Sequence, residues 1–206
     1  MIDVWQTVAA ERGALADDLA GISAEQWDTP SLNHEWTVHH TLAHMTSTAH
    51  TGPARFVGGM VASGFRFGEF TERGIVRHHG LTAAETLANF RAIQGSRKSP
   101  PGPRTSWLGE TLIHAEDIRR PLGISHDYPA EAVALCLDFF KRSNLLIGAK
   151  RRIDGLSLAA TDQDWQYGAG TTVRGRGIDL LMAMTGRGAA CADLTGSGVA
   201  TLQSRC

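Results

Sequence analysis

Residues 107–120 are WLGETLIHAEDIRR, a run that predicts a helix with Glu110 and His114 on one face. Residues four positions apart lie one turn apart on an α-helix, with Cβ atoms about 5–6 Å from each other. A carboxylate and an imidazole at this spacing can reach a single divalent cation. The neighbouring Leu112 and Ile113 indicate an apolar environment, in which a charged carboxylate is costly unless it is paired or bound to a metal.

A third ligand must come from another segment, because a zinc site with a position open for water or substrate usually has three protein ligands. The stretch 35–45 has helical apolar spacing, and His44 is its best candidate. His40 lies one turn earlier and competes for the role, or orients a ligand through a hydrogen bond. Taken alone, Glu110 and His114 are more often a solvated or mutually bonded surface pair.

Length and charge favour a soluble enzyme over a nucleic-acid-binding protein. The 206 residues suffice for one large domain, or for a main domain with a small appendage. A net charge of −1, from 20 basic and 21 acidic residues, gives no reason to expect nucleic acid or an anionic membrane. No apolar run approaches the ~20 residues of a membrane span, and the first residues do not resemble a signal peptide. We therefore expect a cytoplasmic protein.

The three cysteines, Cys136, Cys191 and Cys206, are far apart and include no C-x-x-C pair. This spacing supports neither a disulfide scaffold nor a thiolate zinc site. Cys136 lies in an apolar pattern and is predicted to be a small buried hydrophobe. A redox-sensing Cys136 or Cys191 is a weaker alternative, and it predicts thiol labelling at low pH.

Helical patterns dominate the first 150 residues and predict an antiparallel four-helix bundle, whose interior commonly holds metals. Thr37 is a predicted N-cap, and Thr82 with Glu85 forms a predicted capping box. The glycine-punctuated stretch 58–74 is predicted to be a lid or a loop. The helices are predicted at 3–21, from Thr37 towards Gly52, from Thr82 past Ile93, and at 105–122, with a fifth at 129–149.

The pattern changes after Arg152. Residues 156–161 and 171–174 are predicted strands, followed by a short helix at 178–185 and a last strand near 199–202. The predicted fold class is therefore mainly α with a small α+β C-terminal part. We expect a helical domain at residues 1–150 and a small α/β domain at residues 151–206.

Three motifs along the chain carry a family resemblance. They are WTV followed by LAH at 36–44, the Glu110–His114 pair followed by DIRRPLG at 117–123, and LLMAMTGR at 180–187. Together they resemble the mycothiol-dependent maleylpyruvate isomerase family of the DinB-like superfamily, in the expected order over nearly the whole chain. One departure is His39-His40, where relatives commonly have Arg-Asp, and it weakens transfer of the family's substrate.

The resemblance implies a DinB-like four-helix bundle with zinc, or another divalent metal, on His44, Glu110 and His114. It also implies mycothiol as a cosubstrate, whose metal-bound thiolate attacks a small electrophile in an isomerisation or an S-transfer. Asp117 and Arg119 either support the ligands or form an ion pair. Arg187 is a candidate binder of a substrate carboxylate, or simply a cation favoured at a helix C-terminus.

The implied partners are the electrophile and the low-molecular-weight thiol, and the chain is expected to be a monomer or a homodimer. A non-catalytic module that binds a metal or a small ligand is the alternative function. A closed shell of four ligands that includes His40 would favour this module, whereas an open site would favour an enzyme.

Overall fold

The computed structural model describes residues 2–33, 35–144 and 147–206. Contacts within the chain divide it into two units, Asp3–His126 and Asp127–Cys206. Among the described residues, no helix has the length and apolar character needed to cross a membrane.

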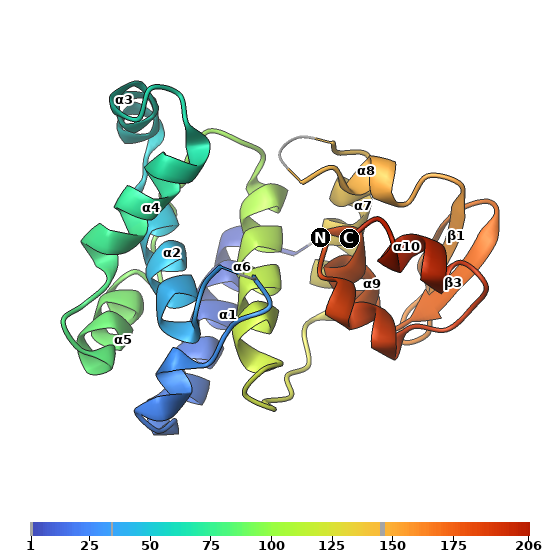
Figure 1. Cartoon of the computed structure of the whole chain (residues 1–206), viewed down its shortest axis with the longest axis horizontal. Helices are drawn as coiled ribbons and strands as arrows, with labels where there is room; N and C mark the ends of the chain where they lie inside the picture. Colours follow the sequence, from blue (N-terminus) through green and yellow to red (C-terminus); the bar gives the residue numbers. More distant parts are fainter. Residues whose placement is uncertain (1, 34, 145–146) are drawn as a thin grey trace. The chain divides into compact units, whose positions relative to one another are not determined.

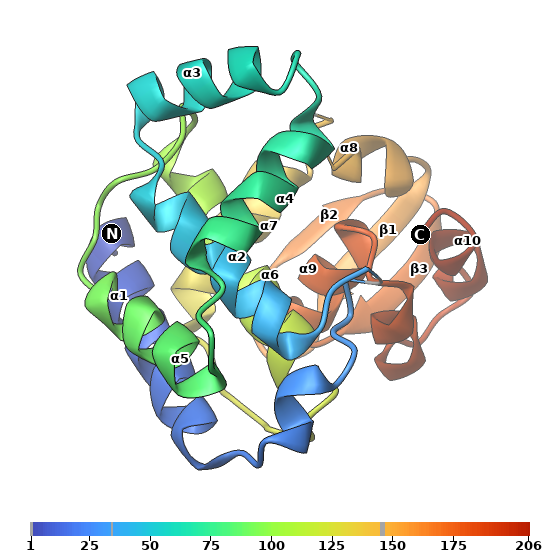
Figure 2. The ribbon, with the colours of Figure 1, turned by 60° about the vertical axis from the view of Figure 1, so that its left-hand side comes forward.

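The first unit is a helical bundle centred on α2, as Figures 1 and 2 show. Helix α2 packs against α4, α5 and α6, while α1 packs against α6 and α5. The predicted mainly helical fold is confirmed. The elements are α1 (Val4–Asp18), the 3-10 turns η1 (Leu19–Gly21) and η2 (Glu25–Asp28), α2 (Val38–His50), α3 (Pro53–Ala62), α4 (Phe67–His78), α5 (Ala83–Ala92) and α6 (Arg104–Arg119).

Local sequence signals fix where these helices begin. The Thr37 hydroxyl accepts a hydrogen bond from the backbone N–H of His40 at the start of α2. At the start of α5, Thr82 accepts from the Glu85 N–H, and the Glu85 carboxylate accepts from the N–H of Leu81. Both predicted caps therefore satisfy backbone donors that the first turn of a helix leaves without partners.

An apolar core holds the bundle together. It combines Leu15 of α1, Leu42 and Met45 of α2, Phe90 of α5 and Ile118 of α6, all of them buried. Helices α2 and α6 pack against each other in this core, so the side chains of one helix have fixed positions relative to those of the other. The ligand candidates of α2 and α6 project from these two helices.

The stretch 58–74, predicted to be a lid or a loop, instead contributes to α3 and α4. Its glycines permit close packing. A Cβ at Gly59 would lie 2.5 Å from the Phe70 ring of α4, and one at Gly74 would lie 2.4 Å from the Ser47 hydroxyl of α2.

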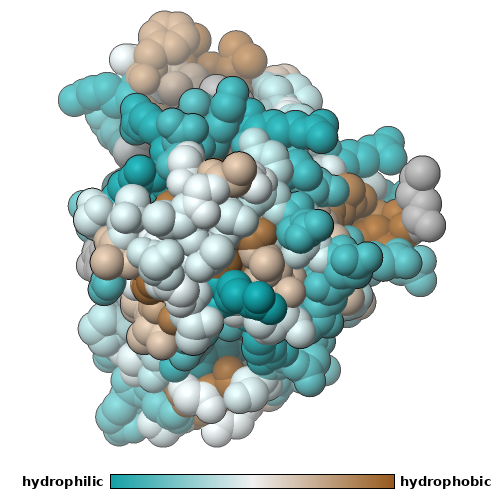
Figure 3. Space-filling model, turned by 90° about the vertical axis from the view of Figure 1, so that its right-hand side faces the viewer, coloured by the Kyte–Doolittle hydropathy of each residue, from teal (hydrophilic) through white to brown (hydrophobic). Residues whose placement is uncertain are grey.

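No side chain of α3 is buried, and Val57 and Val61 are each 59% exposed. In Figure 3, which keeps the vertical axis of Figure 1, apolar side chains are exposed at the top of the molecule, where Figure 1 shows α3.

The second unit contains a three-stranded sheet in the order β2-β1-β3, in which β1 is antiparallel to β2 and parallel to β3. The turn between β2 and β3 requires glycine at 170, where φ is 128° and a Cβ would lie 2.1 Å from the Gly155 carbonyl oxygen. The elements are α7 (Ala130–Phe140), α8 (Ala149–Arg152), β1 (Leu156–Ala160), β2 (Gln166–Gly168), β3 (Thr171–Gly175), α9 (Gly177–Met184), η3 (Gly188–Asp193) and α10 (Val199–Gln203).

Two sequence predictions for this unit differ from the structure. The strand predicted near 199–202 is the helix α10, in which the Leu202 N–H donates to the Gly198 carbonyl oxygen at 3.0 Å. The helix predicted at 129–149 ends at Phe140, and its positions 145–146 lie outside the described residues. Helix α7 packs against α9, so contacts group it with the C-terminal unit, whereas the sequence pattern changes near residue 150.

Candidate metal centre

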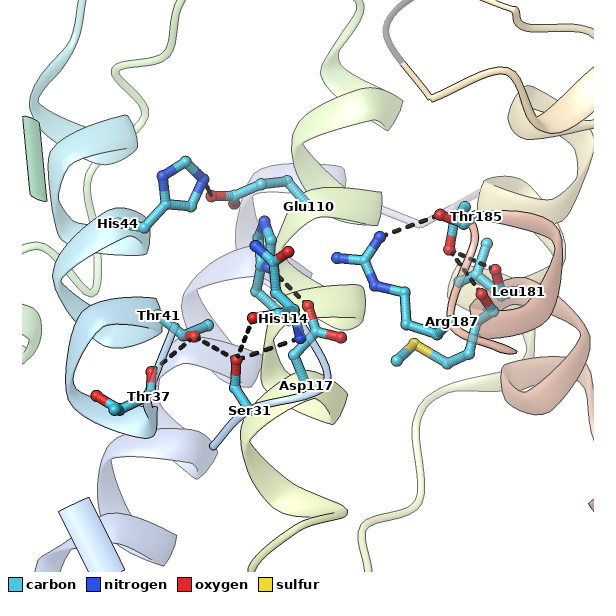
Figure 4. A network of polar contacts seen from close by, with 12 residues as sticks. Ser31, Thr37, Thr41, His44, Glu110, His114, Asp117, Leu181, Thr185 and Arg187 are labelled. Atoms are coloured by element: carbon cyan, nitrogen blue, oxygen red, sulfur yellow. Dashed lines mark hydrogen bonds and ion pairs between the residues drawn. The ribbon is translucent and has the colours of Figure 1, made fainter. Parts of the chain in front are cut away.

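The structure brings His44, Glu110 and His114 together between α2 and α6 (Figure 4). Each offers a ligand atom, and these atoms all lie within 4.8 Å of one another. Nε2 of His44 is 3.9 Å from Oε1 of Glu110. Among the described residues, no other group of three or more His, Cys, Asp or Glu side chains is placed to hold one metal ion.

Glu110 is a buried carboxylate with no hydrogen-bond partner for either oxygen. Burial raises the pKa of its carboxyl group, while His114, Arg12 and weaker interactions with the hydroxyls of Thr48 and Thr111 act in the opposite direction. Burial outweighs these interactions, and a buried carboxylate without sufficient compensation is unfavourable in a folded protein. The Glu110 carboxylate with the two imidazoles beside it therefore suits a cation, which would compensate the buried charge.

His114 is held in place by a neighbour on the same helix. Its Nδ1 lies 2.9 Å from Oδ2 of Asp117, a fully buried carboxylate. A histidine that donates one ring N–H to a carboxylate keeps its other nitrogen available as a metal ligand. Of the two supporting residues suggested by the sequence, Asp117 contacts a candidate ligand, whereas Nε of Arg119 donates to Asp18 of α1 at 2.7 Å.

Trp36 forms an aromatic wall beside the two imidazoles. Its ring centroid lies 4.7 Å from that of His44 and 6.1 Å from that of His114. The indole Nε1–H donates to Oε1 of Glu72 on α4 at 3.1 Å. The half-buried Trp36 thus limits the space around the ligand candidates. Its hydrogen bond to Glu72 connects this side of the site to α4.

His40, the competing ligand from the sequence, lies outside the group of three. Its Nδ1 is 2.9 Å from the Thr37 hydroxyl, and its ring faces His79 with centroids 5.1 Å apart. The ring of the adjacent His39 lies against that of His79, with centroids 3.6 Å apart and planes tilted by 31°, and its Nε2 is 2.6 Å from the Thr86 hydroxyl. Burial, His79 and His40 lower the pKa of His39 to about 4, so His39 is neutral near pH 7.

The remaining sequence candidates lie in the second unit. Arg187 follows α9, and its Nη1 donates to the Thr185 carbonyl oxygen at 3.1 Å. Burial raises the pKa of the Cys136 thiol, and burial with Cys206 raises the pKa of Cys191 to about 11. Labelling of Cys136 or Cys191 at low pH is therefore not expected, because the reactive thiolate is scarce there.

Comparison with known proteins identifies a family and a fold. The sequence pattern of the mycothiol maleylpyruvate isomerase N-terminal domain matches residues 8–119. Two crystal structures of the mycothiol-dependent maleylpyruvate isomerase, one of them a histidine-to-alanine mutant, align with a TM-score of 0.61 at 15% sequence identity. The alignment covers 94% of this chain and 91% of the other, and it shows a shared fold. No curated protein matches the sequence significantly.

Proposed function

Because the chain belongs to the mycothiol maleylpyruvate isomerase N-terminal domain family, we propose that it is a mycothiol-dependent enzyme acting on a small electrophile. His44, Glu110 and His114 hold a divalent metal, with zinc as the first choice. The reaction is an isomerisation of the maleylpyruvate isomerase type or a thiol S-transfer. The observation that carries this proposal is the buried carboxylate of Glu110, without a hydrogen-bond partner and beside two imidazoles.

The donor set supports an open site. Two histidines and one carboxylate form a ligand set of catalytic zinc sites, which keep a further position for water or substrate. A divalent cation at this position would favour the deprotonated form of a thiol that coordinates it. His40, the fourth ligand that would have closed the shell, contacts Thr37 instead.

The chain's own residues prepare this chemistry. The Asp117 carboxylate fixes the ring orientation of His114 through the 2.9 Å contact with Nδ1. The Trp36 indole lies against the imidazoles, and reduced contact with water on this side would strengthen electrostatic interactions there. Arg187 is proposed to bind a carboxylate of the substrate through its planar guanidinium.

Metal analysis coupled to activity tests the proposal. Purified wild-type protein should contain about one metal per chain, a stoichiometry expected of a three-ligand site. With mycothiol and a panel of electrophiles, it should accelerate isomerisation or conjugation, and Glu110→Gln should lose both metal and activity. Glu116→Gln is the matched control, because Glu116 lies on the same helix but pairs with Arg120 at 2.7 Å.

Metal content tests the metal site, and turnover tests whether the protein is an enzyme. Wild-type protein without stoichiometric metal, together with unchanged metal content in His44→Ala, would rule out the metal site. Stoichiometric metal without turnover of any electrophile would instead favour a non-catalytic binding module.

A further inference from the structure

Two cysteines of the second unit lie in direct contact. Cys191 belongs to η3 and is 3% exposed, whereas Cys206 follows α10 and is exposed. The two thiols share a side-chain hydrogen bond. The Cβ of Cys206 lies only 3.2 Å from the position of a Cβ on Gly188, so its segment packs closely against the start of η3.

The segment that carries Cys206 is held in place by its neighbours. Nε of Arg152 donates to the Arg205 carbonyl oxygen at 2.9 Å, and Nη1 of Arg205 donates back to the Arg152 carbonyl oxygen at 2.9 Å. The same Nη1 donates to the Asp154 carbonyl oxygen at 2.7 Å. Cys206 is therefore already ordered beside Cys191, and a covalent bond between them would cost little additional conformational entropy.

The two thiols differ in their exposure to solvent, and this difference predicts which of them reacts first with an external reagent. The Cys206 sulfur lies 3.3 Å from the carbonyl oxygens of Ala183 and Leu202, and its residue is exposed. The positive charge of Arg152 favours its thiolate, although burial dominates and the pKa of Cys206 is raised overall. Cys191 is shielded from solvent. An external reagent therefore meets Cys206 first, and Cys191 can react only with a sulfur already at Cys206.

We propose that Cys191 and Cys206 form a reversible disulfide by exchange with disulfides of low-molecular-weight thiols. The Cys206 thiolate attacks one sulfur of R–S–S–R, forms a mixed disulfide and releases one R–S⁻. The Cys191 thiolate then attacks the Cys206 sulfur and releases the second R–S⁻. Overall, two protein thiols lose two electrons, one R–S–S–R is reduced, and the two protons are taken up by the released thiolates.

The bond would join the end of α10 to η3. Arg187 is the N-cap residue of η3, which begins at Gly188, so the crosslink would restrain the backbone next to this arginine. The proposal does not depend on the metal site, because all the residues that carry it lie in the second unit.

Glutathione disulfide is the probe, applied to the full chain between pH 7 and pH 9 and followed by intact-mass spectrometry. Wild type should pass through a glutathione adduct to a product lacking two hydrogens, and dithiothreitol should reverse this change. Well below the thiol pKa, the rate should rise about tenfold per pH unit with the thiolate fraction. Trypsin cuts after Arg187 and Arg205, so the crosslink should join the tryptic fragment that begins at Cys206 to peptide 188–205.

The variants separate the two steps. Cys191→Ser should stop at the adduct, Cys206→Ser should show neither species, and the control Cys136→Ser should behave like wild type because Cys136 is fully buried. A lasting adduct on wild type, no reaction at pH 9, or a crosslink through Cys136 would overturn the proposal. If Cys191→Ser does not fold, the tryptic peptide map of oxidised wild type tests the proposal instead, and absence of the crosslink between Cys191 and Cys206 would overturn it.

Discussion

Glu110→Gln should have opposite effects on stability with and without metal. Burial raises the pKa of the Glu110 carboxyl group above its ordinary value of 4.5, despite His114 and Arg12. The folded state then holds this proton more tightly than the unfolded state, so the contribution of Glu110 to stability falls as pH rises from the ordinary pKa towards the raised one. Glutamine keeps the shape without the charge. In chelator above neutral pH, the variant should be at least as stable as wild type.

Zinc should reverse this order. A ligand that binds only the folded state at 100 times its Kd adds about 2.7 kcal/mol. For a chain of this size, about 1 kcal/mol shifts Tm by roughly 2–4 °C, so wild type should gain roughly 5–11 °C. Glu110→Gln lacks one of the three ligand candidates and should gain almost nothing at the same zinc concentration.

Thermal unfolding in chelator and in zinc measures both effects, and the slope of stability between pH 5 and pH 8 in chelator tests the charge argument. Glu116→Gln should respond to zinc as wild type does. The reasoning fails if Glu110→Gln gains as much from zinc as wild type, or if its stability in chelator falls as steeply with rising pH.

Three further substitutions test the site and its support. Asp117→Asn, which weakens the 2.9 Å contact with His114, should lower zinc affinity about 10- to 100-fold in a chelator competition titration. Leu42→Ala should cost about 2–5 kcal/mol in urea unfolding, because its side chain is fully buried in the core. Asp18→Ala removes the carboxylate that accepts from Nε of Arg119 at 2.7 Å and should cost about 1.5–3 kcal/mol by the same assay; no measurable loss would contradict this prediction.

The sequence predicted those parts of the site that depend on local geometry. Glu110 and His114 share a helix, so their spacing alone predicts a common face. The contact with His44 is tertiary: its place on an apolar helix made it a candidate, and the order of the family motifs supported it. That both oxygens of Glu110 have no hydrogen-bond partner could not be predicted, because this depends on which side chains surround it.

The two incorrect predictions have different physical origins. Glycines at 58–74 were taken as breaks, yet Gly59 and Gly74 allow neighbouring side chains to approach within distances that a Cβ would block. The apolar residues at 199–202 fit a strand or a helical turn equally well, and only the hydrogen bond from Leu202 to Gly198 identifies the turn. Short segments carry too little periodicity to distinguish these cases.

The distribution of the ligand candidates over α2 and α6 also constrains the order of folding events. His44 and Glu110 are separated by a chain segment of about 65 residues, and closing such a loop costs about 4 kcal/mol in entropy. The complete site can therefore form only after the two helices have docked through the core. Metal should bind late, slowing unfolding more than it accelerates folding, as expected for contacts absent from the transition state.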